Sequence, residues 1–189
     1  MTAQTKSTGK RTMLILAIVF IVPIVLAKLA LENDWFNRAA SNLGELITPP
    51  LDMSILQGPS DTPKWRILYL LPEVCDARCE NAIYSLSQVH KALGVESTRV
   101  ESIVISTETS HADEIQSLQK HTNIKLLKSN VESVKQVFKD QRTDVIFVAD
   151  TLNNVILRYA LYSDAQESVL HSRDILLDLK RLLKLSRIG

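Results

Sequence analysis

Two cysteines, Cys75 and Cys79, are the residues of this sequence best suited to chemistry. They lie four residues apart, after the apolar run 66–71 and at the opening of a stretch of helical periodicity over 77–93. This spacing puts the two sulfur atoms about one helical turn apart on one face. Because a helix N-terminus stabilises anions, we expect Cys75 to be the more acidic thiol. Such a pair can close a disulfide, exchange disulfides with a partner, or bind a soft metal ion such as Cu(I).

Other candidate groups near the cysteines are acidic. Glu73, Asp76 and Glu80 would raise the thiol pKa values and so oppose the helix terminus. The histidines form no metal-binding pattern with the cysteines: His90 lies far along the same predicted helix, and we expect exposed positions for His111 and His121 and a position just before the last helix for His171. Two cysteines cannot make a four-cysteine zinc site, and the sequence has no hydrolase, P-loop or dinucleotide-binding motif.

The N-terminal part is predicted to cross a membrane. Residues 13–27 are all apolar, and the apolar stretch continues to residue 31 across a single Lys28. Residues 1–30 hold four of the 22 basic residues and none of the 21 acidic ones, so the positive-inside rule puts the N-terminus in the cytoplasm. A signal peptide cleaved after Ala27 is the alternative. The rest of the chain is mildly acidic, so nucleic acid is not an expected partner.

The remainder divides into a linker and one domain. Residues 32–63 contain four of the six prolines and are predicted to be a linker without regular elements. Residues 64–189 alternate between strand and helix periodicity. Strands are predicted at 66–71, 100–106, 124–127, 144–149 and 155–161, and helices at 77–93, 112–120, 131–138 and 174–185. The first two strands should be parallel because a helix joins them, and the last two should form a hairpin. This order predicts an α/β domain.

A strand, a Cys-x₃-Cys pair at a helix start, a βαβ unit and a terminal ββα unit together resemble a thioredoxin-like sheet with flanking helices. The chain is similar to the Sco/SenC family, membrane-anchored thioredoxin-like proteins that deliver copper to the CuA site of cytochrome c oxidase. The spacing of Cys75 and Cys79 matches that family. The segment Asp140-Gln141-Arg142 resembles the family's Asp-His-Ser stretch, which places Gln141 at the position of the third copper ligand.

The chain also departs from the family. Gln141 replaces the ligand histidine, and Asp76 and Glu80 stand where the family usually has a proline after each cysteine. No proline follows Pro72, whereas thioredoxin-like oxidoreductases carry a cis-proline that faces the cysteines. The missing histidine disfavours tight Cu(II) binding, and the missing proline disfavours general disulfide exchange.

The resemblance implies a divergent Sco-like protein of the bacterial inner membrane. Residues 1–12 would be cytoplasmic, 13–31 a single transmembrane anchor, 32–63 a linker and 64–189 a periplasmic thioredoxin-like domain. We expect it to assist cytochrome c oxidase assembly as a thiol donor or Cu(I) chaperone through Cys75 and Cys79, rather than to act as an enzyme. Its partners would be the membrane and an oxidase subunit or another assembly factor. The alternatives are a general periplasmic thiol-disulfide oxidoreductase and a structural interaction domain with a plain disulfide.

Overall fold

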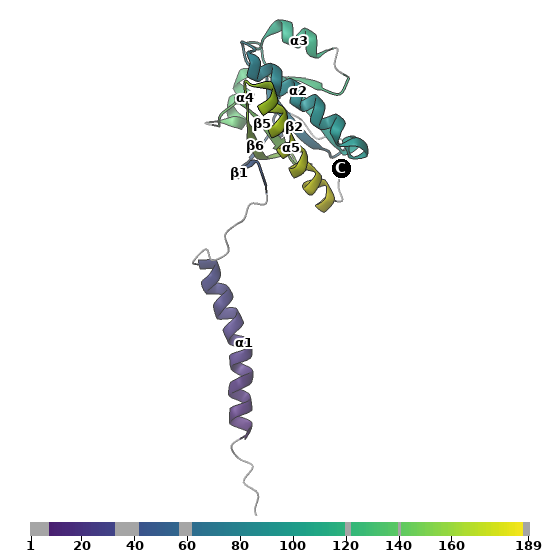
Figure 1. Cartoon of the computed structure of the whole chain (residues 1–189). Helices are drawn as coiled ribbons and strands as arrows, with labels where there is room; N and C mark the ends of the chain where they lie inside the picture. Colours follow the sequence, from purple (N-terminus) through teal and green to yellow (C-terminus); the bar gives the residue numbers. More distant parts are fainter. Residues whose placement is uncertain (1–7, 33–41, 57–61, 120–121, 140, 187–189) are drawn as a thin grey trace, which may run out of the picture. The chain divides into compact units, whose positions relative to one another are not determined.

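The computed structural model describes residues 8–32, 42–56, 62–119, 122–139 and 141–186, in two compact units that divide after Ser41. The first unit contains helix α1 (Thr8–Glu32), drawn in purple in Figure 1. Residues 9–30 of α1 form a stretch long and apolar enough to cross a membrane. They include all of the predicted transmembrane segment 13–31 except its last residue. The apolar side chains of α1 are exposed, as the lipid-facing residues of a single membrane helix would be.

The second unit is built on one six-stranded mixed sheet with the order β1-β6-β5-β2-β3-β4. The strands are β1 (Glu45–Asp52), β2 (Trp65–Leu70), β3 (Val100–Ser106), β4 (Lys125–Lys128), β5 (Val145–Ala149) and β6 (Asn154–Ala160). β2, β3 and β4 run parallel, while β5, β6 and β1 are antiparallel to their neighbours. The predicted parallel pair and the predicted hairpin are therefore confirmed.

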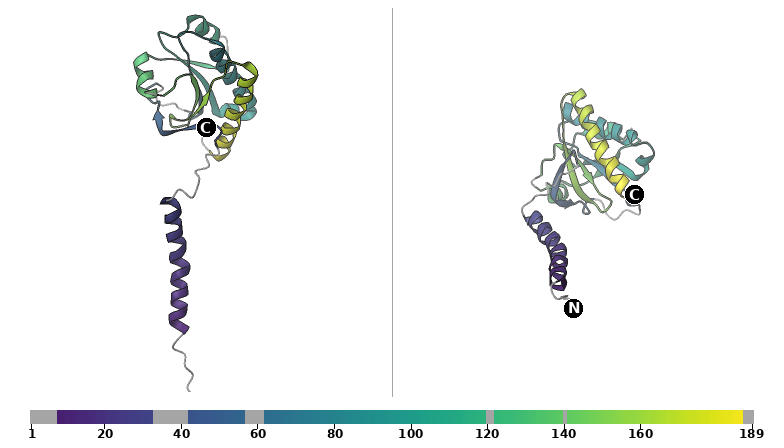
Figure 2. Two further views of the ribbon diagram at one scale, coloured as in Figure 1. Left: turned by 60° about the vertical axis from the view of Figure 1, so that its left-hand side comes forward. Right: turned by 60° about the horizontal axis from the view of Figure 1, so that its bottom comes forward.

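Helices cover both faces of the sheet. They are α2 (Ala77–Ala92), the 3₁₀-helix η1 (Gly94–Arg99), α3 (Ala112–Leu118), α4 (Val131–Phe138) and α5 (Ala165–Leu185). α2 and α5 lie side by side over one face, where residues such as Leu86 and Leu179 pack against the sheet (Figures 1 and 2). α4 and the chain after β1 cover the other face, where the rings of Phe138 and Phe147 pack at a tilt with their centroids 4.8 Å apart. The thioredoxin-like α/β fold is confirmed.

Part of the predicted linker is a strand. β1 forms an edge of the sheet and pairs with β6, with Glu45 opposite Arg158 and Asp52 opposite Asn154. Its sequence, ELITPPLD, lacks the alternation of apolar and polar residues that identifies strands, and two prolines interrupt its middle. Edge strands tolerate proline because one side of the strand makes no ladder hydrogen bonds. The strand therefore depends on a partner more than 100 residues away rather than on its own pattern.

The last helix begins earlier than expected. α5 starts at Ala165, nine residues before the predicted start, with Asp164 as its N-cap. His171 consequently lies inside the helix rather than before it. The inward face of this first part carries Ser168 and Ser172, whose hydroxyls contact Ser85 of α2 at 3.2 and 2.8 Å. Small polar residues let the two helices approach closely but give no apolar periodicity, so the pattern alone did not reveal this part.

Candidate functional site

The two cysteines lie where β2 passes into α2, and their sulfur atoms are joined in a disulfide. Cys79 is in the first turn of α2 and is 1% exposed, because it packs into the core between α2 and the sheet. Cys75 precedes the helix and is only half-buried. The pair thus joins one half-buried cysteine to one buried cysteine.

Asp76, between the cysteines, is the N-cap of α2. Its Oδ1 accepts hydrogen bonds from the backbone N–H groups of Arg78 and Cys79, both at 3.1 Å. Its Oδ2 accepts from Arg78 Nε at 3.1 Å. The Cys79 N–H and the Arg78 contacts hold the Asp76 pKa below its ordinary value. A carboxylate therefore occupies the helix terminus that was expected to stabilise a Cys75 thiolate.

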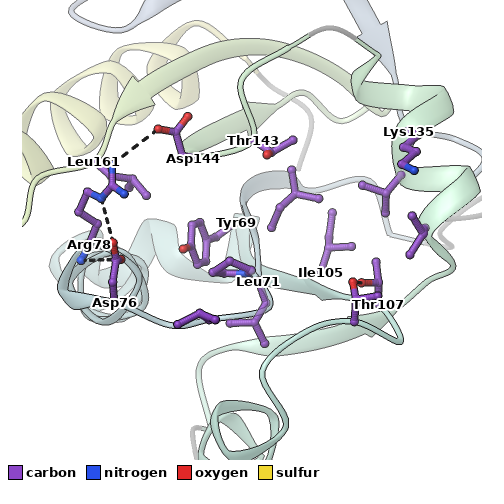
Figure 3. A pocket seen from close by; sticks show the side chains of 16 residues that line it. Tyr69, Leu71, Asp76, Arg78, Ile105, Thr107, Lys135, Thr143, Asp144 and Leu161 are labelled. Carbon is purple, nitrogen blue, oxygen red and sulfur yellow. Dashed lines mark hydrogen bonds and ion pairs between the residues drawn. The ribbon is translucent and has the colours of Figure 1, made fainter.

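A hollow of about 310 Å³ lies beside this turn (Figure 3). Its apolar lining comes from the ends of β2 and β3, from the chain before Cys75 and from α4: Leu71, Pro72, Val74, Ile105, Val131 and Val134. Its polar lining includes Thr107, Lys135, Thr143 and Asp144. The hollow is open to solvent and large enough for a few side chains of a partner segment.

The start of α2 and the loop before β5 meet at one side of this hollow. Arg78 of α2 reaches Asp144, the residue before β5, with Nη1 3.9 Å from Oδ2 (Figure 3). Arg142 holds the same carboxylate through two hydrogen bonds of 2.9 and 3.1 Å. The Arg142 bonds, with the charge of Arg78 contributing less, lower the Asp144 pKa. These contacts connect the cysteine turn to the loop before β5.

Tyr69 forms part of the wall between the core and this hollow. Its side chain is 2% exposed. Burial raises its pKa well above the ordinary value, and the negative charges of Asp76 and Asp144 raise it further. Tyr69 is thus a neutral phenol at physiological pH.

Gln141 has a different set of contacts from those expected of a copper-ligand position. Its Oε1 accepts a hydrogen bond of 2.7 Å from Arg158 Nη1 on β6. Arg158 is in turn paired with Glu45 of β1, whose carboxylate accepts from Arg158 Nε at 2.8 Å. The two described residues of the Asp140–Arg142 segment therefore have different partners: Gln141 contacts β6 and Arg142 contacts Asp144. Asp140 lies outside the described residues.

Three of the four histidines are described, and each has a local partner. His90 Nε2 lies 3.2 Å from the Val100 carbonyl oxygen, and His111 caps α3 by accepting from the Glu114 N–H. His171 stacks on Tyr162 and contacts Asp174 at 3.1 Å. His121 lies outside the described residues. In the part of the chain that the structure describes, no three side chains of His, Cys, Asp or Glu are grouped to hold a metal ion.

Thr143, Asp144 and Arg78 are the site residues that spacing alone did not identify. Asp144 is 66 positions from Arg78 in sequence, and only the antiparallel pairing of β5 with β2 brings the start of β5 to the end of β2. The signal available in the sequence was the position of Thr143 and Asp144 at the start of the predicted strand 144–149.

The family comparison agrees with this geometry. Residues 65–186 match the model of the family described as "Transmembrane-like, thioredoxin-like, C-terminal domain". The chain belongs to this family. Among curated proteins, none matches it.

The chain is also similar to solved structures of Sco proteins. Yeast Sco1 is 13% identical, with a TM-score of 0.53, over 80% of this chain and 100% of the Sco1 chain. Bradyrhizobium japonicum ScoI with copper bound is 18% identical, with a TM-score of 0.45, over 73% of this chain and 98% of that one. A SCO1/SenC family lipoprotein from Bacillus anthracis is 15% identical, with a TM-score of 0.48, over 77% and 98%. At these identities the likeness to yeast Sco1 establishes the fold alone.

Proposed function

We propose that this protein is a membrane-anchored thiol donor that assists assembly of the copper site of cytochrome c oxidase. The observation that carries the proposal is the Cys75–Cys79 pair at the start of α2, in which Cys75 is half-buried and Cys79 is buried, so Cys75 is the more accessible of the two. In disulfide exchange an accessible thiol attacks the partner and a protected thiol resolves the intermediate. The pair has this division, which a purely structural disulfide does not need.

The reaction transfers two electrons from the cysteine pair to an oxidised partner. The Cys75 thiolate attacks one sulfur of the partner's disulfide, forms a mixed disulfide and releases the other partner sulfur as a thiolate. The Cys79 thiolate then attacks Cys75 Sγ, which closes the Cys75–Cys79 disulfide and frees the second partner thiolate. The two protons lost by Cys75 and Cys79 balance those taken up by the partner's thiolates. A separate dithiol reductant must reduce the pair again.

The surroundings of the cysteines support an exchange partner with a short accessible segment. Neither cysteine lines the hollow, but Val74 and Asp76, on either side of Cys75, do. Val74, Val131 and Val134 would contact apolar side chains next to the partner's cysteines. Helix α1 supports action at a membrane, where an oxidase subunit would be met. The Sco-like fold is the reason for proposing that the cysteine pair reduces the cysteines of the oxidase copper site rather than protein disulfides in general.

Delivery of Cu(I) is the second candidate. In the reduced state two thiolates from Cys75 and Cys79 suit Cu(I), which prefers soft sulfur ligands. The donor set does not suit Cu(II): Gln141 offers an amide oxygen where the Sco family has an imidazole, and that oxygen already accepts from Arg158. In this second candidate function, copper is cargo that the two thiols carry.

Trapping of a mixed disulfide tests the thiol-donor function. The full chain in detergent is reduced and mixed with a peptide that contains one disulfide. Cys79→Ser should accumulate a covalent adduct through Cys75, because the resolving thiol is gone. Cys75→Ser should give little adduct, because Cys79 Sγ is enclosed.

The wild-type chain supplies the reference. Cys75 should be alkylated in the reduced protein and protected after oxidation, and the reduced protein should convert the peptide to its dithiol. Equal trapping by the two single variants would contradict the assigned roles. A reduced pair that neither alkylates nor exchanges would leave a plain structural disulfide.

A further inference from the structure

The outward side of α5 carries leucines as well as charges. The solvent-facing side of a helix in a globular protein is usually polar. α5 instead exposes 57% of Leu170 and 46% of Leu177, although its opposite side already packs into the core. Exposed basic residues lie between and beyond these leucines, and at about 100° per residue all of them fall on one side of the helix. We call this surface the outer face of α5; its members are Leu170, Arg173, Leu177, Lys180, Arg181 and Lys184.

The outer face is most basic toward the end of the helix. Between residues 175 and 185 the one acidic residue is Asp178, which is 1% exposed and so adds no charge to the surface. Arg181 contacts Asp178 Oδ1 at 3.3 Å. Lys180 and Lys184 form no ion pair with any residue that the structure describes. Their ammonium groups are therefore available to an anionic partner.

The chain that comes from α1 enters the domain beside the same helix. The N–H groups of Leu43 and Gly44 bond Asp178 Oδ2 at 2.7 and 2.9 Å, and Asp178 precedes Lys184 by less than two turns of α5. Residues 33–41 alone lie between α1 and the described part of the domain, and a chain of that length spans about 35 Å at most. Because α1 is suited to crossing a membrane, the domain stays close to the lipid, where even a weak attraction acts at a high local concentration.

We propose that the outer face of α5 docks on the membrane that holds α1, with its basic side chains on anionic lipid headgroups and its leucines between them. Basic side chains interleaved with leucines are typical of helices that lie at anionic membrane surfaces. The dipole of a helix also favours lysine near its C-terminus, but it gives no reason for exposed leucines. Charge and apolar area together therefore fit a lipid surface. The docking does not depend on the proposed thiol chemistry.

Docking through this face leaves the cysteine turn uncovered. Arg99, directly before β3, donates to the carbonyl oxygens of Leu183 and Ser186, so the end of α5 lies at the start of β3. The cysteine turn follows the end of β2, which runs parallel to β3. The basic end of α5 and the cysteine turn thus lie at opposite ends of the sheet. A domain docked by α5 still presents the cysteines to a partner.

Paramagnetic lipid in nanodiscs measures the docking directly. The full chain is reconstituted at one copy per nanodisc, in phosphatidylcholine alone or mixed with phosphatidylglycerol, with a trace of lipid that carries a gadolinium chelate on its headgroup. Broadening of backbone amide NMR signals then reports which residues lie near the lipid surface. Residues 177–185 are compared with α3, which lies at the cysteine end because the His111 N–H bonds the Pro72 carbonyl oxygen.

In discs with phosphatidylglycerol, the signals of residues 177–185 should broaden and those of α3 should not. The double variant Lys180→Gln, Lys184→Gln should lower the ratio of docked to undocked domain by about tenfold or more. Arg181 is left in place because it contacts Asp178 inside the domain. The matched control is Lys125→Gln, Lys128→Gln, which removes the same charge from the two ends of β4 and should leave docking unchanged. High salt should weaken docking, because it screens the headgroup charge.

Three results would overturn the proposal. The first is equal broadening of residues 177–185 in both lipid compositions, or undiminished broadening in the variant that lacks Lys180 and Lys184. The second is stronger broadening of α3, which would show that the domain meets the lipid with its cysteine end. The third is broadening that requires two copies of the chain in one disc, which would assign the outer face of α5 to contact with a second copy.

Discussion

Gly44 and Asp178, which are 134 positions apart, are joined by a hydrogen bond of 2.9 Å from the Gly44 N–H to Asp178 Oδ2. The same oxygen accepts from the Leu43 N–H at 2.7 Å and from the Tyr159 hydroxyl at 2.9 Å. Asp178 is 1% exposed and lies in α5, so one buried carboxylate fastens the chain that enters β1 to a helix and to β6. The segment between the anchor and the domain is therefore part of the folded domain from Leu43 onward.

Removal of the Asp178 carboxylate should destabilise the domain. Asp178→Ala leaves the Gly44 N–H and the Tyr159 hydroxyl buried without an acceptor and removes the acceptor of the part-buried Leu43 N–H, which should lower the free energy of unfolding by about 3 kcal/mol or more. Asp178→Asn keeps one acceptor oxygen and should cost about 1–2 kcal/mol. Denaturant unfolding followed by Trp65 fluorescence measures both. Asp174→Asn, which removes a half-exposed carboxylate from the same helix, is the control and should change stability by under about 1 kcal/mol. Equal losses for Asp174→Asn and Asp178→Ala would contradict the fastening role.

Gly44 should not tolerate a side chain. A Cβ atom at this position would lie 2.6 Å from Tyr159 Cε1, closer than such atoms approach, and the ring is buried. Gly44→Ala should lower the free energy of unfolding by about 1–3 kcal/mol, because the ring must move. Tyr159→Phe keeps the ring and should not relieve the clash, whereas Tyr159→Leu should make the Gly44→Ala change less costly. A double-mutant cycle measures this coupling, and additive effects would contradict it.

Copper binding should depend on oxidation state. The reduced wild-type chain should bind Cu(I) through Cys75 and Cys79, while Cu(II) binding should be weak. Gln141→His should strengthen Cu(II) binding only if the segment moves toward the cysteines. Because the side chain at position 141 lies against Arg158, we expect little change in Cu(II) binding. Competition titration of wild type, Gln141→His and the double Cys→Ala variant with both ions measures this. Undiminished Cu(I) binding by the double variant would exclude the thiols as the site.

Membrane topology is checked by reporter fusion. We expect alkaline phosphatase fused after the last residue to be active and to stay in the membrane fraction, because Lys6, Lys10 and Arg11 precede the apolar segment. A fusion after Arg11 should be inactive, since that point is expected in the cytoplasm. An inactive C-terminal fusion would reverse the orientation. An active but soluble one would indicate cleavage after Ala27 instead of a retained anchor.

The sequence by itself determined most of the elements of this domain. β3 and α4 have the predicted bounds, and β2, β5 and β6 agree with their predicted ranges to within one residue at each end. Buried runs such as VIFVA and helices with a strong apolar face carry their signal locally, because neighbouring residues suffice to define the buried side. The cysteine pair could be located for the same reason, since both members lie within one turn of chain.

Only the tertiary structure decided the parts that depend on distant partners. β1 has no pattern of its own and exists through its pairing with β6, and the first part of α5 faces α2 with serines in place of apolar residues. Gln141 was assigned from its neighbours in sequence, but its hydrogen bond goes to Arg158 on another strand. Asp144 reaches Arg78 only because β5 lies beside β2. These contacts join residues that are far apart along the chain, so they leave no periodic pattern in the local sequence. Burial and hydrogen bonding in the folded domain determine them.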